Sequence, residues 1–325
     1  MKAIVCEEFG LPATLQYKEV ASLKPKKDEV LVRVSACSVN FPDTLIIQGL
    51  YQFKPTLPFI PGSDIAGVVK EVGENVTAFK VGDAVFGFAM NGGFAEEVIV
   101  QSNAIFPKPE NMDFPIAASF LMAYGTSYHA LKDRAKLQKG ETLVVLGASG
   151  GVGLAAVQLG KLMGTKVIAA ASTDEKLALC KHYGADLTIN YEKEDLKKRI
   201  KELTDGKGAD VIYDPVGGHN TEQALRATAW EGRLLVVGFA AGTIPKIPLN
   251  LTLLKGCQIM GIFWGSFAMQ FPKKNYQNTM ELMQWFSQGK LKPHIHQIFP
   301  LKETAKALEE MMQRKVKGKI VIQNQ

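Results

Sequence analysis

The sequence predicts an α/β protein with two domains, a β-rich domain followed by a parallel sheet that helices cover. Three observations lead to this fold class. The first 110 residues hold short, closely spaced β-type runs, a strand–helix alternation begins near residue 115, and a glycine-rich turn joins one strand to the next helix. A chain of 325 residues is long enough for about two domains of ordinary size.

Three apolar runs rich in β-branched residues predict strands in the first domain: Val30–Val34, Ile65–Gly73 and Phe94–Val100. Turn-forming residues separate them, including Pro61-Gly62 and Asn91-Gly92-Gly93. Short strands with such turns indicate a small barrel-like β domain. We place it at residues 1–120.

The second domain, expected at 121–260, begins after a helical stretch at Ala117–Leu131. Its repeating units are predicted at Leu143–Leu146 (strand), Val152–Met163 (helix), Val167–Ala171 (strand), Asp174–Tyr183 (helix), and the short strands Leu187–Ile189, Val211–Tyr213 and Arg233–Val237. Such alternation implies a parallel sheet. Beyond residue 260 we expect helices at Thr279–Ser287 and Thr304–Arg314 and a closing strand at Lys319–Ile322, in a segment (261–325) that returns to complete the first domain.

The composition is that of a globular protein without a need for nucleic acid. The net charge of +6 is the sum of 38 basic and 32 acidic residues spread along the chain, which suits a small anionic ligand. Four scattered cysteines form neither a metal knuckle nor a disulfide framework, so we expect free thiols and a cytoplasmic location: Cys6, Cys37, Cys180 and Cys257. Because Glu7 and Glu8 come before any apolar core, we expect no secretory signal.

The uncharged stretch Thr142–Gly160 is long enough to cross a bilayer. It contains five glycines, however, and it breaks at a turn in its middle. A buried strand followed by a buried helix explains it better, and we expect no membrane span.

The glycine-rich turn Gly147–Gly153 predicts a dinucleotide site. Gly150 lets the main chain approach a pyrophosphate, and Gly153 lets the helix pack closely on the strand. The helix N-terminus adds free N–H groups and a partial positive charge. We therefore expect cofactor contacts from Ser149, Gly150, Gly151 and Val152. Ala148 replaces the first glycine of the usual pattern, and a tight turn without a ligand is the alternative.

The strand that follows favours NADPH over NADH. NAD-preferring folds place a carboxylate at its end, where it accepts hydrogen bonds from the ribose. Here Val167–Ala171 ends in alanine and is followed by Ser172 and Lys176, a hydroxyl and an ammonium that suit a 2′-phosphate. Asp174 can serve as a helix cap. Lys176 as a merely solvated helix residue stays open.

The sequence resembles the medium-chain dehydrogenase/reductase superfamily, in particular its zinc-free quinone oxidoreductase (zeta-crystallin-like) branch. The matching segments are Val39–Asp43, Pro61–Val69, Val81–Val85 and Gly147–Gly153, and their order covers nearly the whole chain. The resemblance implies a GroES-like first domain, a Rossmann-type second domain with a doubly wound parallel sheet, and an active site in the cleft between them.

The residues at the family's zinc positions predict that no metal is bound. Zinc-dependent relatives carry Cys at the position of Asn40 and a His-Glu pair at Ser63-Asp64, and they have a four-cysteine lobe that is missing here. Asn and Ser are poor zinc ligands. His294 and His296 lack a third ligand nearby in the sequence and are interpreted as surface residues.

Without zinc, the resemblance implies reduction of an activated acceptor such as a quinone or an α,β-unsaturated carbonyl. Asn40 is expected to orient the nicotinamide or the substrate carbonyl. Related enoyl reductases have a tyrosine at the position of Tyr51 that aids protonation, although Tyr51 as a packed aromatic is an equal alternative. Asp43 is the third catalytic candidate, and a purely structural role is the alternative.

The resemblance also implies further cofactor contacts. They are expected from Thr126, Tyr191, Phe239, Ala240, Phe263, Trp264, Gly265 and Arg314. Two other functions stay open: an enoyl-thioester reductase, which shares fold and hydride chemistry, and a non-catalytic NADPH-binding protein like some crystallins. By analogy with relatives we expect a homodimer or homotetramer that acts on a small-molecule substrate.

Overall fold

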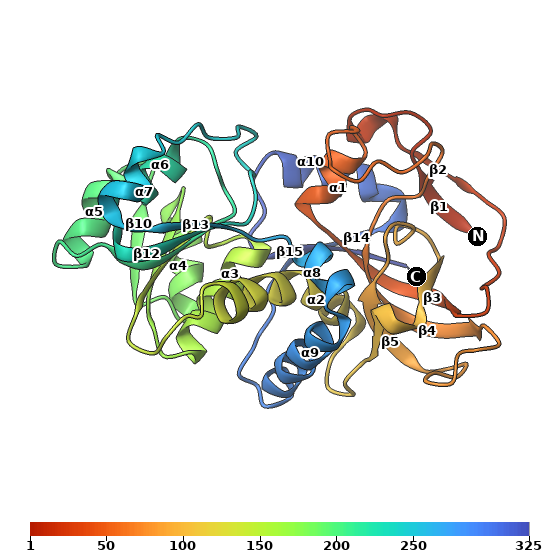
Figure 1. Cartoon of the computed structure of the whole chain (residues 1–325). Coiled ribbons are helices and arrows are strands. Elements are labelled where there is room, and N and C mark those ends of the chain that lie inside the picture. The colour runs from red at the N-terminus through yellow and green to blue at the C-terminus, as the bar shows by residue number, and fades with distance from the viewer. Residues whose placement is uncertain (325) are drawn as a thin grey trace. The chain divides into compact units, whose positions relative to one another are not determined.

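The computed structural model describes residues 1–324 and divides into two compact units (Figure 1). Unit 1 comprises Met1–Met122 and the C-terminal segment from Pro293, and unit 2 comprises Ala123–Lys292. The sequence predicted a return to the first domain from residue 261. The structure instead keeps 261–292 in unit 2, so the predicted boundary at residue 261 is wrong.

Unit 1 is built on a seven-stranded sheet with strand order β14-β15-β3-β4-β5-β7, and β6 also pairs with β3. The hairpin-like pair β1-β2 forms a second, two-stranded sheet. The strands are β1 (Lys2–Val5), β2 (Gln16–Glu19), β3 (Glu29–Val39), β4 (Asp64–Val72), β5 (Ala84–Phe88), β6 (Glu97–Gln101), β7 (Ile105–Pro107), β14 (Ile295–Pro300) and β15 (Lys319–Gln323). Two short helices belong to this unit, α1 (Phe41–Ile46) and α10 (Thr304–Met312).

The long strand β3 organises this sheet. Its first half pairs with β6 and its second half with β15, while β4 runs along its other side. Two register shifts interrupt the β3–β4 pairing, at Leu31/Val32 and between Val34 and Ala36. Bulges of this kind bend and twist a strand, which lets a small sheet curl around its own core. The predicted strand at Val30–Val34 is therefore only the first half of β3, which continues to Val39, directly before Asn40.

Unit 2 holds a six-stranded sheet in which every pairing is parallel. The strand order is β10-β9-β8-β11-β12-β13, so the order reverses between β8 and β11. The strands are β8 (Thr142–Leu146), β9 (Lys166–Ala171), β10 (Leu187–Asn190), β11 (Ala209–Asp214), β12 (Thr228–Val236) and β13 (Gln258–Gly261). This is the doubly wound order of dinucleotide-binding sheets. The predicted α/β class is confirmed.

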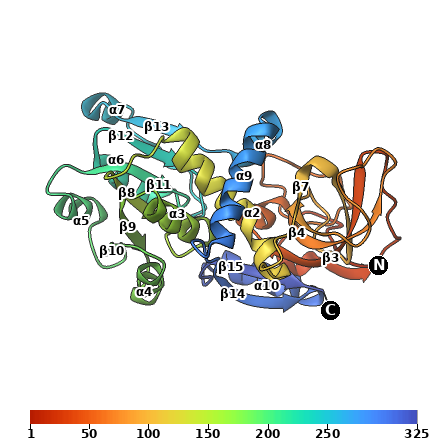
Figure 2. The same cartoon turned by 90° about the horizontal axis from the view of Figure 1, so that it is seen from below.

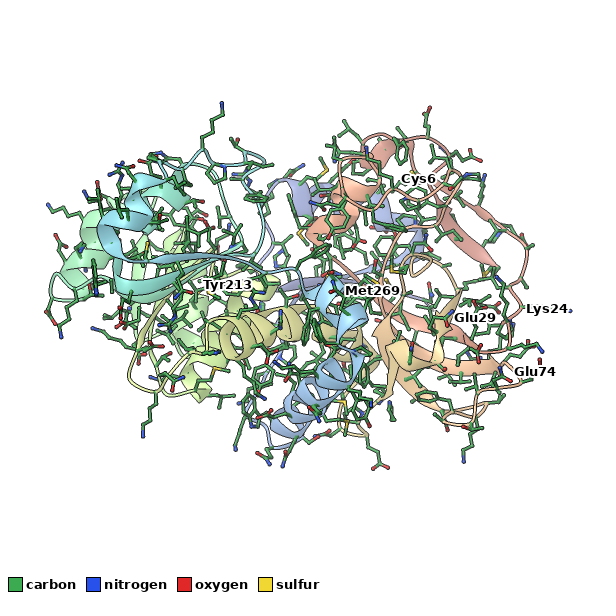
Figure 3. The ribbon with its side chains drawn as sticks, in the orientation of Figure 1. Cys6, Lys24, Glu29, Glu74, Tyr213 and Met269 are labelled. Carbon is green, nitrogen blue, oxygen red and sulfur yellow. The ribbon has the colours of Figure 1, made fainter. Side chains whose placement is uncertain are left out.

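Helices cover both faces of the parallel sheet (Figures 1 and 2). One face is covered by α5 (Leu196–Leu203), α6 (His219–Arg226) and α7 (Asn250–Lys255), whose buried apolar side chains share a core with the strands. The other face is covered by α3 (Gly151–Leu162) and α4 (Asp174–His182). Tyr213, labelled in Figure 3, is fully buried on the central strand β11. At the surface of unit 1, Lys24 and Glu74 point outward in the same figure.

The remaining helices explain why unit 2 extends to Lys292. Helix α2 (Phe114–Tyr128) begins in unit 1 and continues in unit 2 as a π-helix (His129–Arg134). Helices α8 (Trp264–Gln270) and α9 (Pro272–Ser287) pack against this second half. Trp285 meets Tyr128 edge to face at 5.4 Å between ring centroids, and Glu281 pairs with Lys132. These contacts hold the segment in unit 2.

Candidate active site

Strand register in unit 1 brings four polar residues from three segments of the chain together. Ser38 pairs with Asp64 of β4 on one side, and Val39 pairs with Ile320 of β15 on the other. Because β15 runs antiparallel to β3, Lys319 falls beside Asn40, the residue after β3. All four polar side chains are buried.

Asn40 lies at the N-terminus of α1 and is held from both ends. Its backbone N–H donates to Asp43 Oδ2 at 2.7 Å, which places Asp43 in the first turn of the helix. Its side-chain Oδ1 accepts a hydrogen bond from the ammonium of Lys319, which also donates to Val39 O at 3.2 Å. The side-chain Nδ2 has two longer contacts, each 3.4 Å, to the backbone O and the hydroxyl of Ser38, and the Asn40 side chain also hydrogen-bonds Asp64, which lowers the pKa of that carboxyl group.

The two carboxyl groups of this cluster are buried, and burial outweighs the hydrogen bonds that they accept. The hydroxyl of Ser38 donates to Asp64 Oδ2 at 3.1 Å, whereas Asp64 Oδ1 has no hydrogen-bond partner among residues 1–324. Burial raises the pKa of Asp43 to about 7 and the pKa of Asp64 to about 6, although the charge of Lys319 opposes both shifts. Burial in turn lowers the pKa of Lys319. The cluster therefore holds two buried carboxyl groups whose pKa values lie near neutral pH.

Tyr51 follows α1 and packs its ring, half-buried, against the apolar core of unit 1. Burial raises the pKa of its hydroxyl, and the charge of Asp43 raises it further. The phenol therefore keeps its proton at neutral pH. Both predicted roles, proton donor and packed aromatic, remain predictions.

The glycine turn of unit 2 lies at the point where the strand order reverses, between the carboxyl ends of β8 and β11. Gly150 caps α3, which begins at Gly151, so the first N–H groups of this helix lack partners within the helix. A Cβ on Gly153 would lie 2.4 Å from Gly147 O, so only glycine permits this close packing. A Cβ on Gly150 would meet nothing closer than 3.4 Å, which leaves its surface open to a ligand. Ser149 is buried in the turn.

Strand β9 brings the predicted phosphate-binding residues to the next position along the sheet. Lys176 Nζ donates to the hydroxyl of Ser172 at 3.2 Å. The register of β10 on β9 pairs Asn190 with Ala171, so Tyr191 follows at the same carboxyl edge. The helix cap is Thr173 rather than Asp174, because Thr173 Oγ1 accepts from Lys176 N. Asp174 instead binds Asn190 Nδ2 and Lys193 Nζ, each at 2.6 Å.

The residues predicted at the nicotinamide end have mixed environments. Phe239 and Ala240 lie in the loop after β12, and Phe263, after β13, is 54% exposed. Trp264 is buried, and its indole N–H donates to Asn275 Oδ1 at 3.1 Å. Its ring lies so close to α2 that a Cβ on Gly125 would come within 2.9 Å of it. The structure therefore assigns Trp264 a packing role. The other predicted contacts are Thr126 on α2, Gly265 at the start of α8, and Arg314, which lies in unit 1 with a φ of +57°.

A second buried polar cluster, in unit 2, was not predicted. His129 Nδ1 lies 2.9 Å from Asp133 Oδ2, Asn278 donates to the same oxygen at 2.8 Å, and Lys274 Nζ lies 2.9 Å from Asp133 Oδ1. The His129 ring stacks on Phe267 with 3.8 Å between centroids. The sequence contained one signal, the spacing of His and Asp four residues apart within a helical run.

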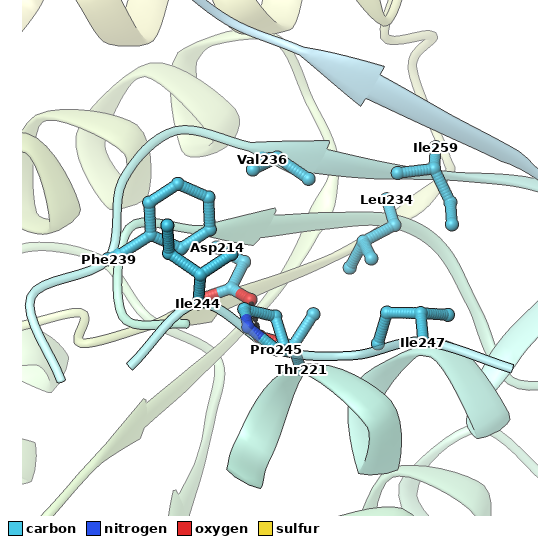
Figure 4. A pocket seen from close by; sticks show the side chains of 9 residues that line it. All are labelled: Asp214, Thr221, Leu234, Val236, Phe239, Ile244, Pro245, Ile247 and Ile259. Atoms are coloured by element: carbon cyan, nitrogen blue, oxygen red, sulfur yellow. Dashed lines mark hydrogen bonds between the residues drawn. The ribbon is translucent and has the colours of Figure 1, made fainter. Parts of the chain in front are cut away.

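A cavity of about 140 Å³ lies beside Phe239 in unit 2 (Figure 4). Its walls are mostly apolar, and its two polar residues already bind each other, since Thr221 Oγ1 donates to Asp214 Oδ2 at 2.6 Å. Asp214 Oδ1 accepts from two backbone N–H groups. The cavity thus offers few polar groups to orient a ligand.

Residues 1–324 contain neither a cluster of metal-binding side chains nor a helix suited to cross a membrane. No group of three or more His, Cys, Asp or Glu side chains within this range has a geometry that could hold a metal ion. Within the same range, none of the helices combines the length and the apolarity needed to cross a bilayer. The uncharged stretch Thr142–Gly160 forms strand β8, the glycine turn and most of α3.

The chain matches two family models, the alcohol dehydrogenase GroES-like domain at residues 26–110 and the zinc-binding dehydrogenase at 151–285. A quinone oxidoreductase-like protein 2 homolog from Nematostella vectensis is 41% identical over 324 residues, which span 99% of this chain and 88% of the relative. The chain belongs to the zinc-free quinone oxidoreductase branch of the medium-chain dehydrogenase/reductase superfamily. The sequence resemblance is confirmed, and unit 1 is the GroES-like domain.

Solved structures agree over the full length. The quinone oxidoreductase of Pseudomonas syringae is 33% identical with a TM-score of 0.94, and the alignment covers 99% of each chain. The Escherichia coli quinone oxidoreductase, solved in complex with NADPH, is 28% identical with a TM-score of 0.94, covering 99% of this chain and 100% of the other.

Proposed function

We propose that this protein is a zinc-independent, NADPH-dependent reductase that transfers hydride to a quinone or another α,β-unsaturated carbonyl. The observation that carries the cofactor assignment is the contact between Lys176 and Ser172 at the end of β9, next to the glycine turn. An ammonium and a hydroxyl at this position suit a ribose 2′-phosphate. Asp174, at the start of α4, forms a salt bridge with Lys193, whose hydrogen bond and charge lower the pKa of Asp174.

The cofactor fits the residues of unit 2. The turn at Gly150 leaves space at the N-terminus of α3, where unpaired N–H groups attract a pyrophosphate. When bound, NADPH supplies the hydride. In unit 1, Asn40 can donate from Nδ2 to a carbonyl oxygen, and Tyr51, whose pKa is raised by burial, can supply the proton.

The absence of zinc ligands supports direct reduction. Asn40 and Ser63 are poor metal ligands, and Lys319 brings its own positive charge into the same cluster. We infer that substrate polarisation comes from hydrogen bonds rather than from a Lewis acid.

The proposal is tested by NADPH oxidation with a panel of a quinone, an enone and an enoyl thioester. We expect the quinone or the enone to accelerate oxidation, with activity kept after dialysis against a chelator and with no zinc by elemental analysis. A preference for the enoyl thioester would assign the alternative reductase function. Tight NADPH binding with no active acceptor would instead indicate a non-catalytic binding protein.

Lys176→Ala is expected to weaken NADPH binding by about 1.5–3 kcal/mol, because one charge-assisted contact is lost. NADH binding should change little, since NADH carries no 2′-phosphate. Fluorescence titration with both cofactors measures the two affinities. Lys181→Ala, on the same helix α4, serves as the matched control. Equal losses for NADPH and NADH would show that Lys176 does not read the phosphate.

We further propose a homo-oligomer in a reducing compartment such as the cytoplasm. Strand β13 is the last strand of its sheet, and near it several large apolar side chains are exposed: Trp230, Ile244, Leu249, Leu253, Leu254 and Ile259. An unpaired edge beside an apolar surface suits a second copy of the chain. Light scattering of the wild type and of Leu253→Glu tests this, with a shift to monomer expected. The four cysteines are buried and unpaired, as a reducing compartment requires.

A further inference from the structure

Lys319 is a buried cation whose partners show what it does. Only 5% of its surface is exposed, and three apolar residues follow it in strand β15. A buried ammonium is costly unless acceptors surround it. Its acceptors are Asn40 Oδ1 and Val39 O, and the carboxyl groups of Asp43 and Asp64 lie near enough to oppose the lowering of its pKa. No part of Lys319 is exposed enough to serve as a surface charge.

The contact with Lys319 fixes which end of the Asn40 amide is free. An asparagine side chain offers one acceptor and one donor group, and the orientation follows from its hydrogen-bond partners. An ammonium can only donate, so it selects Oδ1. The Nδ2 group carries two N–H donors. Its contacts with Ser38 are 3.4 Å, which is long for hydrogen bonds, and a hydrogen bond from the Asn40 side chain also lowers the pKa of Asp64, so one donor can be engaged there and one is left. It can therefore still donate to a ligand.

The charge of Lys319 also strengthens that donor. A cation at the amide oxygen polarises the amide, and hydrogen bonds in series reinforce one another in a dry environment. The negative charges of Asp43 and Asp64 offset part of the free-energy cost of burying the Lys319 ammonium.

We propose that Lys319 is a positioning residue that makes Asn40 a hydrogen-bond donor toward the carbonyl oxygen of the acceptor. Lys319 acts through Asn40 and does not touch the substrate. This inference rests on the proposed reductase function. It adds a specificity rule: the site favours ligands that present an acceptor atom to Asn40 over ligands that present a donor.

The test is a double-mutant cycle of Lys319→Met and Asn40→Ala, measured as kcat and KM with NADPH and duroquinone. Each single change should lower kcat by about 10- to 100-fold with a smaller change in KM, as for partners that orient a functional group. The double variant should be no slower than Asn40→Ala alone, because Lys319 has nothing left to position. Lys319→Arg should recover most of the activity, since a guanidinium also only donates. Independent, multiplying losses in the double variant would overturn the proposal.

Stability is checked separately, because Lys319→Met removes the positive charge that faces Asp43 and Asp64. Lys319→Gln keeps a donor without the charge and should be intermediate in kcat. If Lys319→Met does not fold, an activity of Lys319→Gln equal to that of Lys319→Arg would overturn the contribution of the charge. Lys255→Met is the matched control, because Lys255 also donates to a backbone oxygen, that of Thr228 at 3.1 Å, away from this cluster. It should leave kcat unchanged.

A readout without turnover separates this inference from the proposed function. In protein labelled with ¹⁵N-asparagine, the side-chain resonances of Asn40, assigned by their loss in Asn40→Ala, should shift in Lys319→Met and stay near their place in Lys319→Arg. Unshifted resonances in Lys319→Met would sink the inference even if quinone reduction is observed. If the wild type is inactive but the Asn40 resonances shift in Lys319→Met, the reductase function is rejected. The inference that Lys319 positions Asn40 then still stands.

Discussion

Two buried polar clusters, around Asp133 in unit 2 and around Asp43 and Asp64 in unit 1, shift the pKa values of their carboxyl groups in opposite directions. In unit 2, burial alone would raise the pKa of Asp133, but hydrogen bonds from His129, Lys274 and Asn278 outweigh it and lower the pKa to about 2. In unit 1, burial raises the pKa of Asp43 to about 7 and that of Asp64 to about 6. All three side chains are almost completely removed from water.

The donors and charges around the carboxyl groups differ between the two clusters. Asp133 has three side-chain donors for its two oxygens. Hydrogen bonds from Ser38, Met122 N–H and Asn40 lower the pKa of Asp64, and the N–H of Asn40 lowers that of Asp43, but burial outweighs these donors at both. Where hydrogen bonds and a nearby positive charge outweigh burial, as at Asp133, the carboxylate stays ionised, and where burial outweighs them, as at Asp43 and Asp64, the group titrates near neutral pH. The unit 2 cluster therefore anchors helices, and the unit 1 cluster suits chemistry.

The largest effect is expected from Asp133→Ala. It removes the common acceptor of the cluster that joins the π-helix to α9, and it leaves the buried His129 and Asn278 without it. We expect a loss of about 3 kcal/mol in the free energy of unfolding. Urea unfolding, followed by the fluorescence of Trp264 and Trp285 in unit 2, measures it.

Asp133→Asn is the matched variant, because it keeps the shape and one acceptor oxygen. Its loss should be smaller than that of Asp133→Ala. If both variants unfold at the wild-type urea concentration, the cluster does not anchor α9, and the contrast between the two units loses its basis.

The pH dependence of stability gives the next effect. The folded pKa of Asp43, about 7, lies above its ordinary value of 3.8, so between these values the folded state binds a proton that the unfolded state has released. Its contribution to stability is present below pH 3.8 and is lost as the pH rises through 7. Asp43→Asn should remove this loss, so its stability relative to wild type should rise by about 1–4 kcal/mol from pH 4 to pH 7.5.

Asp133 supplies the control for this measurement. Its folded pKa is depressed, so its contribution is present above pH 3.8 and is lost only as the pH falls toward 2. Asp133→Asn should therefore leave the slope between pH 4 and pH 7.5 unchanged. Parallel stability curves for wild type and Asp43→Asn would mean that Asp43 is ionised throughout this range.

The parallel sheet of unit 2 was predictable because its signals are local. Strand and helix runs alternate at regular intervals, and Gly153 marks the one place where a helix must pack on the turn before it. The end of unit 2 was not predictable in this way. Helices α8 and α9 contain no strand pattern, and they belong to unit 2 through contacts such as Phe267 on His129, which join residues far apart in the sequence.

The candidate site was partly predictable for the same reason. Asn40, Asp43 and Tyr51 lie within one short segment, so a single resemblance points to all of them. Lys319 opens a predicted strand, where a lysine ordinarily extends to solvent. Only the register of β15 on β3 places it beside Asn40, and register between segments about 280 positions apart leaves no local trace.

The smallest effect tests whether hydrogen bonds or the charge of Lys274 keep Asp133 ionised. Lys274→Met removes the one formal charge that faces Asp133, but the Lys274 side chain is 52% exposed, so solvent screens the pair. We expect a loss of only about 0.5–1 kcal/mol, because His129 and Asn278 still bind the carboxylate. Lys27→Met is the control, since its pair with Glu74 is exposed on both sides (72% and 63%) and should cost close to nothing. If Lys274→Met destabilises the protein as much as Asp133→Ala, charge pairing rather than the number of donors keeps Asp133 ionised. The unit 1 carboxyl groups, which also face a lysine, would then need another reason for their raised pKa values.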